Sequence, residues 1–196
     1  MAIVNSKNHY GSKLFIVLIL AIISGFISVS ALRGNYTAMT KLRSAVTVAD
    51  EQNTDVEKAL KDLRTHVYSH MNTNLSSGNA SIKPPIQLKA RYERLRSQEA
   101  ERIKSYNASV TSEGERVCGG LYPAGGFNAV RVQCIQSYVA ENAITESVVP
   151  DDLYKFDFIS PAWSPDLAGI SMVLSIGFFI VFFSTVAKIQ IKKRYF

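Results

Sequence analysis

The sequence predicts a mainly α-helical membrane protein in which two transmembrane helices flank an extracytoplasmic helical domain with one disulfide-closed loop. Three observations support this prediction. Residues 14–32 and 167–187 are long apolar stretches without a charged side chain. Between them, apolar residues recur at steps of three and four, which is typical of helices. The two cysteines of the chain, Cys118 and Cys134, both fall between these stretches.

The first apolar stretch is long enough to cross a bilayer, since a hydrocarbon core of about 30 Å needs about 20 helical residues. A buried core helix of this length would normally carry a polar face. Lys7 and Lys13 precede the stretch, and it ends in small residues around Ala31, so a signal peptide cut after Ala31 is the alternative. We predict a cytoplasmic N-terminus at residues 1–13 and an uncleaved transmembrane helix at 14–32.

The second predicted span covers residues 166–187. We expect Ser164 to cap the helix, Pro165 to occupy its first position and Asp166 to lie near its positive end. Trp163 suits the level of the lipid headgroups. The tail at 188–196 is basic and should stay in the cytoplasm, which places residues 33–165 outside the cytoplasmic membrane; its basic residues are Lys188, Lys192, Lys193 and Arg194.

The net charge of +6 does not indicate a nucleic-acid partner. Lys7, Lys13 and the four basic residues of the tail make up six positive charges, which equals the whole excess. These residues lie next to the predicted spans, where they would contact anionic lipid. The predicted partner of the basic ends is therefore the lipid bilayer, and the outer domain is close to neutral.

The outer domain begins with a heptad pattern of apolar residues from Met39 to His70. We expect the first span to continue as one helix to about Ser76, with Asn53 at a register-fixing position. The helix would pack within its own domain or, alternatively, form a coiled coil with a second copy of the chain. A turn at 72–81 should lead to a second helix at 85–109 lying back along the first, a third helix at 128–148 and an extended segment at 149–161.

Cys118 and Cys134 are predicted to form a disulfide, because an extracytoplasmic location is oxidising. The loop that they close should stabilise the fold by about 3 kcal/mol. Glycine pairs flank Leu121, Tyr122 and Pro123 inside this loop. These residues are either displayed to a partner or packed back onto the helices.

No standard catalytic or cofactor motif is found in the sequence, so we expect no enzyme activity and no cofactor. His66 and His70 lie four residues apart and would share one helix face, but no third metal ligand accompanies them, and we predict no metal site. Glu99 and Glu101 are read as solvated surface. Four Asn-x-Ser/Thr sequons, which are glycosylation acceptors in eukaryotes, occur at Asn35, Asn74, Asn79 and Asn107.

The order of span, long helix, hairpin return and span is similar in outline to the helical-bundle sensor domains of bacterial chemoreceptors and kinases. The resemblance is one of architecture and involves no shared motif. Only nine residues follow the second predicted span, so signalling would require a partner protein. The sequence thus favours a non-enzymatic envelope interaction or scaffold protein that contacts another membrane or envelope protein. A sensing subunit that signals through a partner is the alternative, followed by a metal- or haem-binding membrane subunit.

Overall fold

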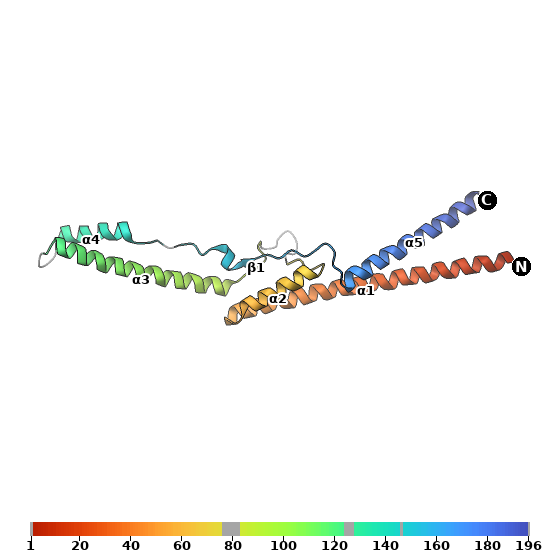
Figure 1. Ribbon diagram of the computed structural model, residues 1–196, viewed down its shortest axis with the longest axis horizontal. Helices are drawn as coiled ribbons and strands as arrows, with labels where there is room; N and C mark the ends of the chain where they lie inside the picture. The colour runs from red at the N-terminus through yellow and green to blue at the C-terminus, as the bar shows by residue number, and fades with distance from the viewer. Residues whose placement is uncertain (1, 76–82, 124–127, 146, 196) are drawn as a thin grey trace. The chain divides into compact units, whose positions relative to one another are not determined.

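The computed structural model of the chain describes residues 2–75, 83–123, 128–145 and 147–195. This part is mainly helical, as predicted, and its elements are α1 (Ala2–Gln52), α2 (Val56–Ser69), β1 (Ile86–Gln87), α3 (Lys89–Leu121), α4 (Ala129–Asn142), a 3₁₀ helix (Asp151–Leu153), β2 (Lys155–Phe156) and α5 (Leu167–Tyr195) (Figure 1). β1 and β2 pair as a two-stranded sheet. The chain divides into two compact units: unit 1 contains the described residues of 1–86 and 156–196, and unit 2 those of 87–155.

In unit 1, the first helix ends at Gln52, so the prediction of one continuous helix to Ser76 is wrong. Asn53 adopts a positive φ of 53°. Its N–H donates to Asp50 O at 3.3 Å, and the N–H of Thr54 donates to Ala49 O at 3.0 Å. This pair of bonds is the Schellman motif, which closes a helix with one left-handed residue. Asn53 therefore ends a helix and does not set the register of a coiled coil.

The next helix begins immediately after this turn. Asp55 caps α2 by accepting a hydrogen bond from the N–H of Lys58 at 2.9 Å. The chain reverses direction, so that α2 packs against α1. The apolar positions of the heptad pattern are buried between the two helices, namely Met39, Val46, Ala49, Val56, Leu60, Leu63 and Val67. The predicted cover of the α1 stripe by residues 85–109 is wrong, because α2 provides that cover.

The other partner of α1 is α5 (Figure 1). Both helices are long and apolar enough to cross a membrane, over Ser12–Gln52 and Leu167–Lys192. Two hydroxyl groups join them: Ser28 Oγ donates to Ala168 O at 3.2 Å, and Ser175 Oγ donates to Ala21 O at 3.0 Å. The pairing of low with high residue numbers makes the helices antiparallel. The buried contact residues are small, namely Ala21, Ser24, Ser28, Ala168, Ser171 and Ser175.

The start of α5 differs from the predicted cap. Asp166, and not Ser164, caps the helix, because Asp166 Oδ1 accepts from the N–H of Gly169 at 2.9 Å and Asp166 O accepts from the N–H of Ile170. The preceding turn folds over the helix at Gly169, where a Cβ atom would lie 1.8 Å from Ser164 O and 2.8 Å from Trp163 Nε1. Only glycine fits this position. Ser164 is buried and serves a different contact, described with the polar junction below.

Candidate functional site: the closed end of the α3–α4 hairpin

In unit 2, α3 and α4 pack together as a hairpin that carries the disulfide. Cys118 lies on α3 and Cys134 on α4, with their Cα atoms 5.9 Å apart, so the predicted disulfide is confirmed. Cys118 is fully buried. Gly114 allows the ring of Tyr138 to approach α3, since a Cβ atom there would lie 3.0 Å from that ring. The two helices are therefore joined both covalently and by close packing.

Two predicted helix boundaries near the disulfide are corrected by the structure. α3 continues past residue 109 through Gly119 and Gly120 to Leu121, so it includes the first part of the segment predicted to be a loop. A Cβ atom at Gly119 would lie 3.2 Å from the Arg131 guanidinium, which shows that α4 packs closely over this last turn. α4 is also shorter than the predicted 128–148, since it ends at Asn142.

The predicted display residues lie where α3 ends. Leu121 is the last residue of α3 and is 64% exposed, and Tyr122 is 38% exposed. Pro123 is exposed as well. On the other side of the hairpin end, Asn128 caps α4, and Val130 in the first turn of this helix is also exposed. Residues 124–127 lie outside the described part of the chain. The sequence left open whether these residues are displayed or packed back onto the helices; in the structure, the side chains of Leu121 and Tyr122 are exposed.

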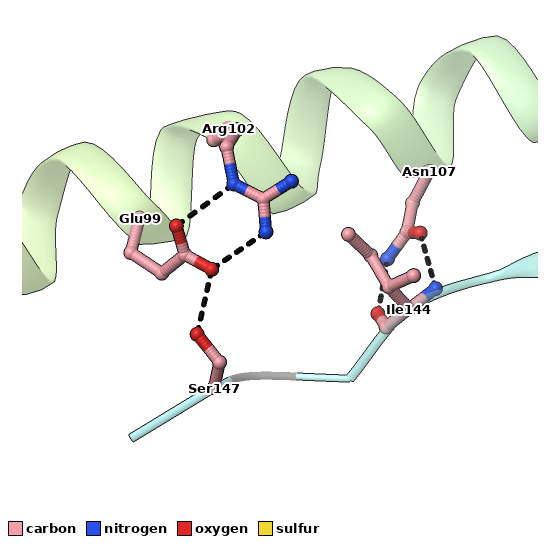
Figure 2. Close-up of polar contacts among 5 residues, drawn as sticks. All are labelled: Glu99, Arg102, Asn107, Ile144 and Ser147. Carbon is pink, nitrogen blue, oxygen red and sulfur yellow. Dashed lines mark hydrogen bonds and ion pairs between the residues drawn. The ribbon is translucent and has the colours of Figure 1, made fainter. Parts of the chain in front are cut away.

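An extended segment after α4 runs along the N-terminal half of α3 (Figure 2). Asn107 Nδ2 donates to Ile144 O at 3.0 Å, and the N–H of Ile144 donates to Asn107 Oδ1 at 3.0 Å. Ser147 Oγ donates to Glu99 Oε1 at 2.7 Å. Further along, the N–H of Leu88 donates to Tyr154 O at 2.8 Å. The face of α3 is thus covered by α4 at one end and by the extended segment at the other.

Glu99 is the charged centre of this contact. Arg102 donates two hydrogen bonds to the Glu99 carboxylate, at 2.8 and 2.7 Å. These bonds, followed by the bond from Ser147, lower the pKa of Glu99 from 4.5 to about 2, against a smaller opposing effect of desolvation. Sequence reasoning missed this role and read Glu99 as solvated surface. The sequence carried only a weak signal of a contact on this side of α3: Asn107 is a polar residue on the same helix face as the apolar residues Ile103 and Val110.

The predicted extended stretch at 149–161 is present in part. Only Lys155 and Phe156 form a strand, and a 3₁₀ helix precedes them. Tyr154 packs against Tyr92, with ring centroids 4.7 Å apart. The alternation of aromatic and charged residues that suggested a strand therefore marks a short strand with irregular ends.

A second polar cluster, which we call the polar junction, joins three segments of unit 1. Asn35 on α1 donates from Nδ2 to Asp166 Oδ2 at 2.8 Å and to Met71 O at 3.3 Å. The N–H of Met71 donates to Ser164 Oγ at 3.0 Å. His66 Nε2 lies 3.0 Å from Asn35 O. The junction ties α1, the end of α2 and the start of α5 together.

The histidines of this junction have hydrogen-bonding roles. Because a carbonyl only accepts, the contact of His66 Nε2 with Asn35 O makes this nitrogen the donor, whereas His70 Nδ1 lies 3.0 Å from His66 O and 2.9 Å from Ser69 Oγ, a hydroxyl that can donate or accept. His66 Nε2 is thereby occupied as a donor in this geometry. The rings stack with centroids 4.4 Å apart. Among the described residues, no group of three or more His, Cys, Asp or Glu side chains is placed to hold a metal ion.

The predicted membrane-interface residues lie at both ends of α5. Trp163 is half exposed and its indole lies against Gly169. Lys188 and Lys192 are exposed on the last turns of α5, as is Arg194; Lys193 also belongs to this helix.

Comparison with protein-family models, curated proteins and solved structures finds no match to the chain.

Proposed function

We propose that the protein is anchored in a membrane by α1 and α5, through residues 14–32 and 166–187. The observation that supports this is the distribution of side chains on the two helices. Large apolar residues point outward, among them Phe26 at 75% exposed, whereas the residues between the helices are alanine and serine. A water-soluble protein rarely exposes an apolar patch above a few hundred Å². Small residues between helices and apolar ones outside are typical of packing in lipid.

The orientation follows from the charges and the disulfide. The basic end of α5 favours the cytoplasm, so residues 33–165 would lie outside. A disulfide between Cys118 and Cys134 fits an oxidising compartment. The bonds from Ser28 and Ser175 favour an uncleaved first span, because cleavage after Ala31 would remove the partner of α5. Protease protection of membrane vesicles tests this topology, and digestion of residues 33–165 from the cytoplasmic side would refute it.

We further propose a non-catalytic role: unit 2 presents Leu121 and Tyr122 to another membrane or envelope protein. The support is that two apolar side chains are exposed on a segment held by a disulfide and by helix packing. A rigid support lowers the entropy lost when these side chains are immobilised by a partner. Aromatic residues are also enriched among the residues that dominate binding energy at protein interfaces.

A photocrosslinking amino acid at Tyr122, introduced in the native host, tests this role. We expect a covalent adduct to one protein of defined mass. Tyr106 is the matched control, because it is an exposed tyrosine within α3, away from the hairpin end. Equal adducts from both positions, or none from Tyr122, would contradict the proposal. An adduct with twice the mass of the chain would identify a second copy as the partner.

A second candidate role is that of a sensing subunit that passes a conformational change to a partner. It is supported by α1, which runs without a break from the first predicted span to Gln52, and by the polar junction that links α1 to α5. Spin labels at the outer and cytoplasmic ends of the spans separate the roles. A ligand-dependent change in the distance between the labels on α1 and α5 would favour sensing, and a fixed distance in the partner complex would favour a scaffold.

A further inference from the structure

The segment that leads into α5, residues 158–164, belongs to unit 1 and is held against the rest of the unit by three of its residues. Phe158 is buried, and its ring meets that of Tyr68 edge-on, with centroids 6.1 Å apart. Ser160 Oγ donates to Asn74 Oδ1 at 2.8 Å. Ser164 Oγ accepts from the N–H of Met71 at 3.0 Å. The path of residues 158–164 is therefore fixed at three points.

Two large apolar side chains on this fixed segment are exposed. Ile159 is 77% exposed, although it lies between the anchored residues Phe158 and Ser160. Trp163 is 49% exposed and precedes the anchored Ser164. Their exposure cannot be attributed to a loose chain end. Along the chain, the next exposed large apolar residues are Leu167 and Ile170 of α5, which face lipid in the proposed topology; Ser164, Pro165 and Asp166 lie between them and Trp163.

The level of this segment along α1 is given by the residues that it contacts. Asn72 Nδ2 donates to Leu32 O at 3.3 Å, and Leu32 is the last residue of the first apolar stretch. Asn74, which accepts from Ser160, follows Asn72 by two residues. Asn35 meets Asp166 one helical turn beyond Leu32. The Trp163 end of the segment thus lies where the apolar part of α1 ends, at the expected boundary between hydrocarbon and headgroups. The Ile159 end contacts Asn74, next to Leu75, whose backbone O accepts from Arg43 farther along α1.

We infer that Ile159 and Trp163 form a lipid-binding surface that enters the headgroup–acyl boundary of the outer leaflet beside α5. This inference rests on the proposed transmembrane anchoring and adds a third membrane contact to the two spans. An indole suits this boundary because one edge is polar and the rest of the ring is apolar. Ile159 supplies a second exposed apolar side chain on the same segment. The bilayer is favoured over a protein partner because this segment leads directly into α5, and because Ser164 and Asp166 hold its Trp163 end near the end of the apolar part of α1.

The single tryptophan of the chain makes the inference measurable. The full chain is reconstituted in phosphatidylcholine vesicles whose acyl chains carry bromine, which quenches tryptophan on contact, either near the headgroup or near the chain end. Unsubstituted Trp163 should be quenched more by the headgroup-proximal bromine. In a Trp163→Phe background, Ile159→Trp should show the same preference and a similar extent of quenching.

Two further probes in the same background serve as controls. Val48→Trp replaces an exposed apolar residue of α1 that is 48 − 32 = 16 residues beyond Leu32, about 24 Å along the helix, and it should not be quenched. Phe26→Trp lies within the first span and should be quenched most by the deep bromine. If Ile159→Trp resembles Val48→Trp while Phe26→Trp is quenched, the inference is wrong and the anchoring stands. If Phe26→Trp is not quenched either, the anchoring itself is refuted.

Discussion

The side-chain amide of Asn107 binds the backbone of Ile144 at both its N–H and its C=O, as a neighbouring β-strand would. One side chain on α3 thus replaces a strand and holds the extended segment in place (Figure 2). The bond geometry uses one acceptor and one donor of the amide. No smaller or purely acidic side chain supplies both groups.

Asn107→Ala should release the extended segment from α3. Both backbone groups of Ile144 would lose their partner, which costs about 1–3 kcal/mol. Hydrogen exchange of the Ile144 amide measures the loss directly and should become faster. Asn142→Ala is the control, since Asn142 bonds only to Tyr138 O in its own helix. Unchanged exchange at Ile144 in Asn107→Ala would show that other contacts hold the segment.

Gly169→Ala should destabilise the start of α5. The new Cβ atom would lie 1.8 Å from Ser164 O, so the turn at 163–166 would have to move. Overpacking of this kind typically costs about 1–3 kcal/mol. Thermal unfolding in detergent, followed by Trp163 fluorescence, should show a lower midpoint and a shifted emission. Gly177→Ala in the same helix meets no atom within 4 Å and should leave both unchanged.

Loss of the disulfide should loosen unit 2 selectively. The closed loop, with a sequence separation of 16, contributes about 3 kcal/mol, or roughly a 100-fold change in the local opening equilibrium. In the Cys118→Ser, Cys134→Ser double variant, amides of α4 should exchange with solvent faster by about that factor. Amides of α2 belong to unit 1 and report on global damage. Equal acceleration in α2 would mean that the effect is not local.

The contact between Glu99 and Ser147 should depend on pH. Because folding lowers the pKa of Glu99 from 4.5 to about 2, its stabilising effect is complete above pH 4.5 and is lost as the pH falls toward 2. Carbon-13 NMR of the Glu99 carboxyl should titrate with a midpoint near 2. Arg102→Ala should move this midpoint upward, since Arg102 is the largest cause of the shift. A midpoint near 4.5 in the unsubstituted protein would show that the contact does not persist in solution.

The four sequons should differ in their use if the chain is expressed in a eukaryotic secretory system. Asn35 and Asn107 donate from their side-chain nitrogens to partners in the fold, so a glycan on that nitrogen would disrupt these contacts. Asn74 is exposed, and its side-chain oxygen, not its nitrogen, accepts the bond from Ser160. Mass spectrometry should find glycan at Asn74 and little at Asn35 or Asn107. Full occupancy at Asn107 would mean that the Ile144 contact forms poorly. Asn79 lies outside the described residues.

Local sequence patterns identified the helical regions and most buried positions, because burial on a helix follows its periodicity. The pattern from Met39 to Val67 marked the right residues but assigned them to one helix. Two neighbouring signals were available: an asparagine able to adopt positive φ at position 53, and Asp55 as a helix cap. They were outweighed by a heptad repeat that continues in phase on both sides of the turn.

The contacts in Figure 2 could not be predicted from such patterns. Asn107 and Ile144 are 37 residues apart, and Glu99 and Ser147 are 48 apart. Their pairing depends on where α4 ends and on the direction in which the chain returns. Neither is determined by propensity near these residues. The disulfide was the exception among long-range contacts, because the chain has only two cysteines.

The hydroxyl bonds between α1 and α5 also constrain how the two helices can move. Ala21 and Ser28 are 28 − 21 = 7 residues apart, as are Ala168 and Ser175, so the two bonds lie about two helical turns apart. A piston-like slide of one helix past the other would break both bonds at once. It would also disturb the close approach at Gly25 on α1, where a Cβ atom would lie 3.1 Å from Ser175 Oγ. In the scaffold role, the pair should therefore shift or tilt as a single body, whereas a change in the distance between α1 and α5 in the sensing role requires these bonds to break.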